Sequence, residues 1–433
     1  MTAPAAQDAA PRVRMPSGPG EVRLPPCTGA LRRAFKHPRL MHYNRLAAGV
    51  LAGNLAAATA GTTGGWWDAR TLSYMALANV ALAVIVRNQY VINLFFRVAT
   101  SAPTRWPLRI RWTLGKVYHF GGLHVGGALS GSLWFCASVV ALTAEGADAA
   151  VLSVSYAPLL LLATMLVTAL PRIRTPHHDL FERTHRFAGW AALALLWAQA
   201  VLTGSAVALW VLAGITGSVA LPWLRLRKVP VGITRPSSHV ALLRFNHGET
   251  PFAGSSTAVS RSPLLEWHSF ANVPAPGEEG FRLTVSRAGD WTGRLVDDAP
   301  EKLWVKGITT AGVANIERLF TKVVYVATGS GIGPCLPHLL AQEVPATLVW
   351  STRSPRHTYG DALVDEILAV QPDALIWDTD ERGKPDMVRL AYWAYERSGA
   401  EAVICISNKK LTWRVVNALE SRGIPAYGAI WDS

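Results

Sequence analysis

Six long apolar segments, separated by short loops rich in arginine, make up most of the first half of the chain. A helix needs about 20 predominantly apolar residues to cross the hydrocarbon layer of a membrane. The second segment contains Arg87 and Asn88, so it either leaves the layer early or continues as an interfacial helix. The segments predict a six-helix transmembrane α bundle over residues 41–228, with spans at 46–66, 71–96, 117–142, 150–171, 186–204 and 205–223.

The basic residues fall on one set of loops. Arginines and lysines precede the first segment, lie between the second and third and between the fourth and fifth, and follow the sixth. The opposite loops hold little charge beyond Arg70, Glu145 and Asp148. Because positive loops stay on the cytoplasmic side, we expect a multi-pass protein of the cell (plasma) membrane with both termini in the cytoplasm.

The formal net charge of +13 needs no nucleic acid to explain it, since the flanks of spanning helices account for the basic residues. Membrane lipid is the expected partner. Residues 1–40 start with an Ala- and Pro-rich stretch without an apolar core, which predicts a disordered cytoplasmic tail rather than a cleaved signal peptide. Neither a zinc site nor a disulfide framework is indicated, because the four cysteines are far apart: Cys27, Cys136, Cys335 and Cys405.

Three histidines lie near the cytoplasmic ends of the predicted spans: His119 and His124 in the third, and His185 in the fifth. Ionisable groups inside a membrane are costly and often functional, and neutral imidazole is a good axial ligand for haem iron. His119 and His124 are five residues apart, about 140° around a helix, so one haem could easily use only one of them. Alternatively, all three are interfacial histidines hydrogen-bonded to headgroups, water or carbonyls.

From about residue 238 the pattern changes to strands. "HVALLRFNH" and "FRLTVSRAG" have strand length with Pro- and Gly-rich breaks between them, which predicts an antiparallel β-barrel over residues 229–315. Buried strands such as "ATLVWSTRS" and "EAVICISN" then alternate with helical segments. That alternation predicts an α/β domain with a parallel sheet over residues 316–433.

The α/β domain begins with a strand, a glycine-rich turn and a helix, "KVVYVATGSGIGPCLPHLL". Gly329, Gly331 and Gly333 remove side chains where the backbone turns tightly. Backbone amides at the start of the helix would then suit a pyrophosphate. Glycine-rich turns of this kind also occur without ligands, so the turn alone indicates a nucleotide site only weakly.

Four landmarks occur in an order typical of one kind of redox domain. "SPLLEWHSFANV", "SRAGDWTGRL", "GSGIGP" and "VICIS" are followed by the ending "GAIWDS". Together they resemble the FAD and NAD(P) domain of ferredoxin reductase-type proteins. With the six preceding spans, the chain looks like the integral membrane protein TmpA group of the ferric reductase and NADPH oxidase superfamily.

The resemblance implies FAD and NAD(P)H as cofactors. It assigns Cys405 to the hydride-transfer site and Trp431 to the face of the flavin ring. Arg353, with Arg356, would either grip a 2′-phosphate or remain a solvated loop arginine. The flavin and nucleotide would be bound by Trp267, His268, Ser269, Phe270 and Thr292, and by Thr328, Gly329, Gly331, Gly333 and Pro334.

In the same superfamily the third and fifth spans each carry two histidines, which hold two stacked haems. Here only the inner pair, His119 and His185, matches the family. The outer positions hold residues that do not ligate haem, namely Ser132 or Leu133 and Ala198 or Gln199. The resemblance therefore implies at most one haem b, on the cytoplasmic side.

The chain departs from the family where Ser269 and Ala271 replace the usual residues of the flavin segment, and where Ile406 and Ser407 follow the cysteine. Two functions stay open. One is a membrane-bound flavin oxidoreductase that passes electrons from cytoplasmic NAD(P)H through FAD to an unknown small molecule, a quinone or one inner haem. The other is a catalytically degenerate, reductase-like membrane sensor or a signalling or assembly protein. A transporter is the third alternative and is disfavoured, because its spans should carry paired acidic or polar residues at the middle of the membrane, and these spans mostly do not.

Overall fold

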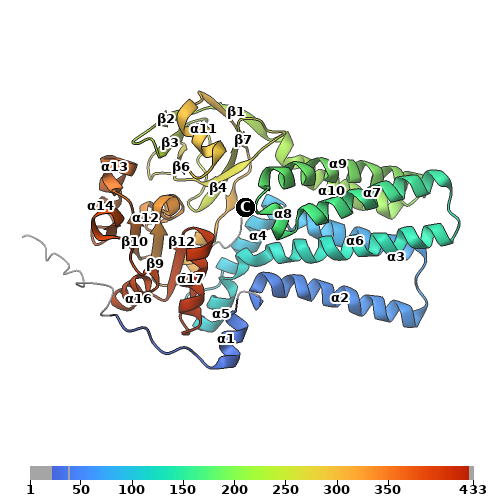
Figure 1. Cartoon of the computed structure of the whole chain (residues 1–433), viewed down its shortest axis with the longest axis horizontal. Helices are drawn as coiled ribbons and strands as arrows, with labels where there is room; N and C mark the ends of the chain where they lie inside the picture. Colours follow the sequence, from blue (N-terminus) through green and yellow to red (C-terminus); the bar gives the residue numbers. More distant parts are fainter. Residues whose placement is uncertain (1–21, 38–39, 429–433) are drawn as a thin grey trace, which may run out of the picture.

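The computed structural model describes residues 22–37 and 40–428. Long helices form one end of the elongated molecule and the sheets form the other (Figure 1). The six predicted spans are helical, but the second is broken after Ile85 and the fifth begins earlier than expected, at His178. They are α2 (His42–Gly64), α3 (Ala69–Ile85), α6 (Gly121–Ala144), α7 (Ala149–Thr168), α9 (His178–Leu202) and α10 (Ala206–Leu224).

Not all of these helices are equally apolar. Among the described residues, three helical stretches are long and apolar enough to cross a membrane: Val117–Ala144, Ala149–Thr168 and Ala206–Leu224. A fourth is added if α3 and the following helix α4 (Gln89–Thr100) count as one broken span. The helices are therefore confirmed, and their crossing of a membrane stays a prediction.

The second predicted span is broken where Arg87 and Asn88 interrupt it. The Asn88 side chain accepts a hydrogen bond from the backbone N–H of Tyr90 at 3.0 Å, which caps the new helix α4. The axes of α3 and α4 differ by 73°. The chain thus turns sharply between α3 and α4, and a short helix α5 (Leu108–Leu114) follows. Whether α4 leaves the membrane or continues as an interfacial helix stays a prediction.

Glycines bring α6 into direct contact with its neighbours. A Cβ at Gly122 would lie 2.1 Å from the Tyr43 carbonyl oxygen of α2, and one at Gly127 would lie 2.8 Å from the Asn79 carbonyl oxygen of α3. The backbone of α6 thus packs against α2 and α3, whereas α9 packs mainly against α7 and α10.

Two antiparallel sheets follow the bundle. One has the order β1 (Leu226–Pro230), β7 (Lys302–Lys306), β4 (Ser255–Ser260), β5 (His268–Ala271), with β8 (Thr310–Ala311) also paired to β4. The other has the order β2 (Gly232–Thr234), β3 (Val240–Phe245), β6 (Phe281–Ser286). Leu243, Leu283 and Leu303 are wholly buried in the core that both sheets share. The predicted antiparallel strands are present, but they form two packed sheets rather than the single closed barrel that the sequence predicts. These two sheets are called the antiparallel module below.

The last part is a five-stranded parallel sheet with the order β11 (Leu375–Asp378), β10 (Ala346–Thr352), β9 (Val323–Thr328), β12 (Ala402–Ile406), β13 (Ala426–Tyr427). Helices α12 (Ile332–Ala341) and α14 (Asp361–Val370) cover one face. Helices α16 (Met387–Ser398) and α17 (Lys409–Glu420) cover the other. The expected parallel sheet covered on both faces is therefore confirmed.

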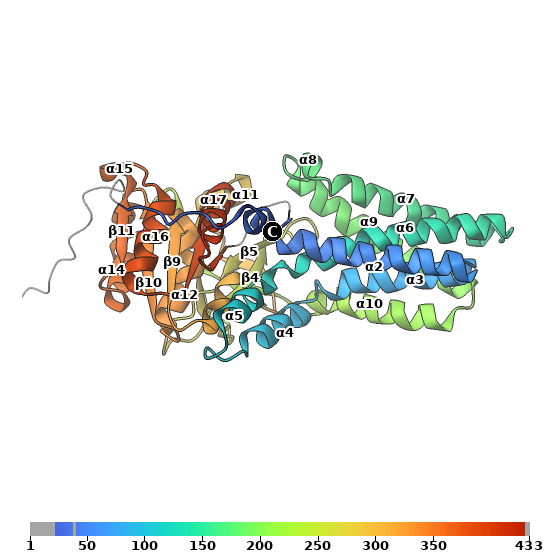
Figure 2. The ribbon, with the colours of Figure 1, turned by 90° about the horizontal axis from the view of Figure 1, so that it is seen from below.

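Residues from the first half of the chain complete one face of this sheet. Ile92 and Phe96 of α4, and Tyr118 just after α5, belong to the same core as Tyr325 and Tyr427 of the sheet. Figure 2 shows α4 and α5 at the junction between the bundle and the sheets. The parallel-sheet domain is thus not covered by its own helices alone.

The prediction of a disordered tail over residues 1–40 is wrong for its described part. Helix α1 spans Ala30–Lys36. The backbone N–H of Thr28 donates to the Ser421 carbonyl oxygen at 2.8 Å, and Lys36 lies 3.6 Å from Glu420. These contacts attach the segment to the end of α17.

Candidate functional site

The strand order of the parallel sheet reverses direction between β9 and β12. After β9 the chain adds β10 and β11 on one side, and then crosses over to add β12 and β13 on the other. In open sheets of this kind, ligands bind outside the carboxyl ends of the strands at such a switch point. The site formed here by the ends of β9 and β12 and the glycine-rich turn is called the crevice below.

The glycine-rich turn lies in the crevice as the sequence predicts. Gly329, with φ of +51°, begins a short 3-10 helix, Gly329–Gly331, that leads into α12. A Cβ at Gly331 would lie 2.1 Å from the Ile406 carbonyl oxygen at the end of β12. A Cβ at Gly333 would lie 3.4 Å from the Thr284 Cβ of β6. The turn therefore touches both the neighbouring strand and the antiparallel module.

Small polar groups close the crevice. The hydroxyl groups of Thr328 and Ser407 are hydrogen-bonded to each other across the ends of β9 and β12. The Trp350 indole N–H donates to the Gly329 carbonyl oxygen at 3.0 Å, which fixes the start of the turn. Pro334 is half-buried in the first turn of α12. The wall is thus made of backbone, hydroxyls and an indole, without a charged side chain among these contacts.

The two predicted flavin segments also come together. The His268 ring of β5 stacks on Trp291 at 4.0 Å between centroids, and Phe270 lies 6.1 Å from the same indole. Trp291 is in the first turn of α11 (Asp290–Asp298). The Thr292 hydroxyl accepts hydrogen bonds from the N–H groups of Ala288 and Gly289, which orders the residues before that helix.

His268 has one ring nitrogen without a partner. Its Nε2 is buried and has no hydrogen-bond partner within the described residues. Burial lowers the pKa of His268, so the ring is neutral at pH 7 and presents one donor and one acceptor. Ser269, next in β5, is exposed. The segment therefore offers an unused polar atom beside an aromatic surface.

Trp267 points to the other side of the strand. Its indole N–H donates to the Pro263 carbonyl oxygen at 2.8 Å, and the Lys306 Nζ lies 4.5 Å from its ring centroid. Trp223, at the end of α10, lies 6.3 Å from Trp267. Burial, assisted by Arg186, lowers the pKa of Lys306 to about 8. Trp267 thus belongs to the contact between the bundle and the antiparallel module, away from His268.

Cys405 does not reach the crevice. Strand alternation turns its side chain toward α16 and α17, where the thiol is 1% exposed in the core with Val415 and Val416. Burial raises the pKa of this thiol to about 12. A buried neutral thiol packs as a small apolar group. Trp431, the other predicted catalytic residue, lies outside the described residues.

Arg353 lies at the end of β10 beyond the crevice. Its side chain is 80% exposed and its Nε is 3.3 Å from an Asp380 carboxylate oxygen. Arg356 lies between Asp361 and Asp365, at 2.8 and 2.7 Å. Both arginines are therefore exposed and paired, so the two sequence alternatives for Arg353 remain open.

The histidines of the bundle pair differently from the sequence expectation. His119 stacks against His42 at 5.9 Å and against Tyr118 at 4.2 Å. The ring that faces His185 is that of His124, at 6.2 Å between centroids. The structure thus places His124, rather than His119, next to His185, and a haem bound by either pair stays a prediction. The cause is local, because His119 lies in a 3-10 turn, Val117–Phe120, whose phase differs from that of the following α6.

His124 and His185 differ in the hydrogen bonds of their ring nitrogens. The Nδ1 of His124 lies 2.8 Å from the Ala83 carbonyl oxygen and donates to it, which leaves Nε2 with a lone pair. The Nδ1 of His185 is buried without a hydrogen-bond partner in the described part of the chain. No group of three or more His, Cys, Asp or Glu side chains suited to a metal ion occurs among the described residues.

Four charged residues that the sequence did not single out join the bundle half to the parallel sheet. Arg111 of α5 donates to both carboxylate oxygens of Glu401 at 2.7 and 2.9 Å. Lys116 lies 2.5 Å from Glu420, and donates to the Ala426 carbonyl oxygen at 2.7 Å. Arg111 and Lys116 are buried. The name dock is used below for the set Arg111, Lys116, Glu401 and Glu420. In the sequence, Arg111 and Lys116 appeared only as basic flanks of a span.

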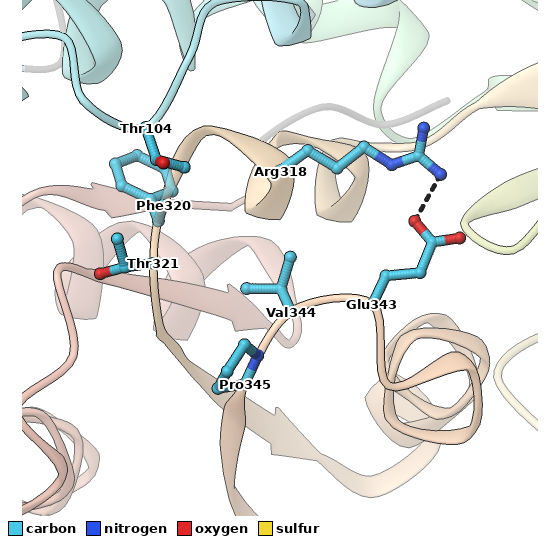
Figure 3. Close-up of a pocket in the computed structure, with 7 residues that line it drawn as sticks. All are labelled: Thr104, Arg318, Phe320, Thr321, Glu343, Val344 and Pro345. Atoms are coloured by element: carbon cyan, nitrogen blue, oxygen red, sulfur yellow. Dashed lines mark hydrogen bonds and ion pairs between the residues drawn. The ribbon is translucent and has the colours of Figure 1, made fainter.

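An open cavity of about 480 Å³ lies at the opposite end of the sheet from the crevice. Thr104, from the α4–α5 connection, faces Phe320 and Thr321 there, and Arg318 is paired with Glu343 at 2.6 Å beside it (Figure 3). None of the predicted site residues lines this cavity.

Comparison with known proteins gives two relatives of known name. The chain is 42% identical to adenylate-forming reductase 03009 of Coprinopsis cinerea over 425 residues, which are 94% of this chain and 41% of that protein. It is 40% identical to adenylate-forming reductase 06235 of the same fungus over 438 residues, 96% of this chain and 43% of that protein. The chain thus spans about two fifths of the length of these curated relatives. A family described as adenylate-forming reductase 03009, C-terminal domain, matches residues 313–433.

Solved structures show only a distant similarity. A ferredoxin NADP+ reductase from Neisseria gonorrhoeae with bound FAD and NADP is 12% identical with a TM-score of 0.37, and covers 47% of this chain and 98% of its own. A ferredoxin reductase of carbazole 1,9a-dioxygenase is 13% identical with a TM-score of 0.38, and covers 48% of this chain and 70% of its own.

Proposed function

We propose that this chain is a flavin-dependent NAD(P)H oxidoreductase module attached to the membrane by its helix bundle. The observation that carries the proposal is the contact between Gly333 of the glycine-rich turn and Thr284 of β6. This contact brings a dinucleotide-type crevice against the module that holds the two flavin segments. The names of the relatives, which are reductases, support the same class of activity.

The residues present fit a flavin. His268 offers a buried ring nitrogen without a partner, Phe270 and Trp291 offer aromatic surface, and Gly289 and Thr292 order the residues before α11. When bound, FAD would accept hydride and release electrons singly. His268 would hold the flavin by donating or accepting one hydrogen bond, and Phe270 would exclude water from it.

The crevice fits the phosphates of a dinucleotide. Gly329 and Gly331 have no side chain at the start of α12, where the helix dipole favours negative charge. The mutual hydrogen bond of the Thr328 and Ser407 hydroxyls would have to open to admit the nicotinamide half. Arg353 would reach a 2′-phosphate only by leaving Asp380.

A single haem b, where it binds, would be held by His124 and His185. Their rings face each other, and His185 has an unpartnered nitrogen. Helices α6 and α9 share few direct contacts, because α6 packs mainly against α2 and α3, and α9 packs mainly against α7 and α10. A haem there would supply a one-electron acceptor near the cytoplasmic end of the bundle. Otherwise the acceptor is a quinone or a small molecule.

A second candidate is a reductase-like membrane sensor without turnover. Two observations favour it: Cys405 is turned into the core, and Ile406 and Ser407 fill the end of β12, where its carbonyl oxygen closes on Gly331. In this case the crevice would bind nucleotide weakly or not at all. Both candidates keep the chain in the plasma membrane with cytoplasmic termini, as a multi-pass protein whose further partners are lipids and not nucleic acids.

An absorption spectrum of the detergent-purified protein, before and after addition of NADPH, tests the proposal. The oxidoreductase predicts a flavin band that bleaches with NADPH, and the sensor predicts colourless protein and no NADPH oxidation. For the haem, His124→Ala should remove any Soret band and His119→Ala should keep it, because only His124 faces His185. Loss of the band in both variants, or in neither, would contradict this ligand assignment.

A further inference from the structure

The α4–α5 segment has two differently occupied sides. Toward the soluble half, Ile92 and Phe96 are buried in the core of the parallel sheet, and Arg111 and Lys116 take part in the dock. Toward the outside, Tyr90, Leu94 and Val98 are 46%, 53% and 64% exposed. These three follow one another at intervals of four residues, so they form one apolar stripe along α4.

The exposed apolar surface continues past α4. Trp106 and Ile110, in the connection and in α5, are 44% and 46% exposed. Before α4, Ile85 at the end of α3 is also exposed, so the apolar stripe is continuous with the surface of the bundle. An amphipathic helix that joins an apolar bundle at a bend of 73° is suited to the interface between hydrocarbon and headgroups.

The charge of this segment has one sign. Residues 87–116 contain no Asp or Glu. Among their basic residues, Arg111 and Lys116 are neutralised by the dock, whereas Arg97, Arg105 and Arg109 are exposed. The outer side thus combines an apolar stripe, an indole at its edge and three exposed guanidinium groups.

We propose that the outer side of the α4–α5 segment lies on the cytoplasmic leaflet and binds anionic phospholipid headgroups. Tyr90, Leu94 and Val98 would enter the acyl boundary, and Arg97, Arg105 and Arg109 would contact the phosphates. This inference rests on the membrane attachment in the proposed function but not on its redox chemistry. Each basic residue near an anionic surface contributes about 1 kcal/mol, a factor of about five in affinity.

The test measures how accessible Val98 is in the whole protein. Cys27 and Cys136, the exposed native cysteines, are replaced by serine, and Val98→Cys is added. The protein is then placed in nanodiscs of zwitterionic lipid, or of zwitterionic lipid mixed with phosphatidylserine. Labelling by a charged maleimide should be at least about fivefold slower in the phosphatidylserine discs. The control variant Glu381→Cys, on the exposed helix α15 (Thr379–Arg382), should label equally in both.

Removing the three arginines separates charge from packing. The triple variant Arg97→Gln, Arg105→Gln, Arg109→Gln should abolish the difference between the two kinds of disc. A matched triple variant, Arg244→Gln, Arg382→Gln, Arg397→Gln, removes three exposed arginines from the soluble half and should keep it. Equal labelling of Val98→Cys in both discs would overturn the inference.

The redox proposal is read out separately in the same discs. Slower labelling in phosphatidylserine discs that contain no bound flavin would support the lipid site and contradict the oxidoreductase. Bound flavin and NADPH oxidation together with lipid-independent labelling would do the reverse.

Discussion

The amino ends and the carboxyl ends of strands β9 and β12 are held by different kinds of contact. At their amino ends, Glu401 and the Leu319 carbonyl oxygen both accept hydrogen bonds from the buried Arg111. At their carboxyl ends, the strands are bridged by one pair of hydroxyl groups and lined by glycine backbone. The same two strands are thus held by charge at one end and closed by weak contacts at the other.

This difference separates attachment from binding. A buried ion pair that loses one partner leaves an uncompensated charge, so the amino ends are costly to pull away from α5. A hydrogen bond between two hydroxyls is worth only about 1 kcal/mol, so loss of the Thr328–Ser407 bridge should cost little, because the backbone pairing of β9 with β12 remains. The parallel-sheet domain is thus attached to the first half of the chain by charge at the amino ends, and it carries the glycine-rich turn at the carboxyl ends.

The largest expected effect comes from breaking the Arg111–Glu401 ion pair at the amino ends of β9 and β12. Glu401→Gln leaves Arg111 buried without a carboxylate and should lower the free energy of unfolding by about 2–3 kcal/mol, the low end for such pairs because Glu401 keeps some contact with solvent. Chemical unfolding in detergent measures this. Arg244→Gln, which breaks an exposed pair with Glu278, should change stability by about 0.5 kcal/mol or less. Equal effects in both variants would remove the distinction between the two ends.

Gly331→Ala changes the packing at the carboxyl ends of β9 and β12. Its Cβ would be 2.1 Å from the Ile406 carbonyl oxygen, so β9 and β12 must shift apart and nucleotide affinity should fall by tenfold or more, on the order of 1–3 kcal/mol of overpacking. In Gly333→Ala the new Cβ would lie 3.4 Å from the Thr284 Cβ, so nucleotide affinity should fall by less than threefold. Titration with NADPH, followed by tryptophan fluorescence, compares the two. A larger loss in Gly333→Ala would contradict the geometry of the turn.

The stability contributed by the Arg111–Glu401 ion pair should also depend on pH. Hydrogen bonding by Arg111 lowers the pKa of Glu401 to about 2, against about 4.3 in an unfolded chain. Because the folded pKa is the lower one, this stabilisation is fully present above about pH 4.3 and is lost as the pH falls toward 2. The pH dependence of unfolding should therefore be shallower in Glu401→Gln over this range. An identical slope in both proteins would exclude Glu401 as its source.

The smallest expected effect is that of Ser407→Ala. It removes the bridge to Thr328 and should cost about 0.5–1.5 kcal/mol of stability. If the bridge must open to admit nucleotide, NADPH should bind this variant up to about tenfold more tightly than the native protein. Thr412→Val serves as a control, because its hydroxyl bonds the Ser407 carbonyl oxygen away from the crevice. Weaker binding by Ser407→Ala would mean that the hydroxyl contacts the ligand directly.

Features with a local sequence pattern could be predicted. The helices follow from apolar length, and the strands follow from short apolar runs. The glycine-rich turn lies at the switch point because a strand and a helix flank it directly. Gly329, Gly331 and Gly333 therefore occupy the positions that their spacing indicates.

Features that depend on distant pairing could not be predicted. Arg111 and Glu401 are 290 positions apart, and no local sequence pattern around either residue predicts that the two form a pair. The helical angle between His119 and His124 does not apply because a 3-10 turn precedes α6. Cys405 was assigned by resemblance, but strand alternation, which the sequence does contain, turns it toward the core.

The covering of the parallel sheet by α4 and α5 has a consequence for biosynthesis. The ribosome makes these helices long before β9, and at about 5–20 residues per second the interval is on the order of tens of seconds. During this time Ile92, Phe96 and Tyr118 lack the residues of the parallel-sheet domain that share their core. We therefore expect this part of the core to form late, only after the last strands of the chain have been made.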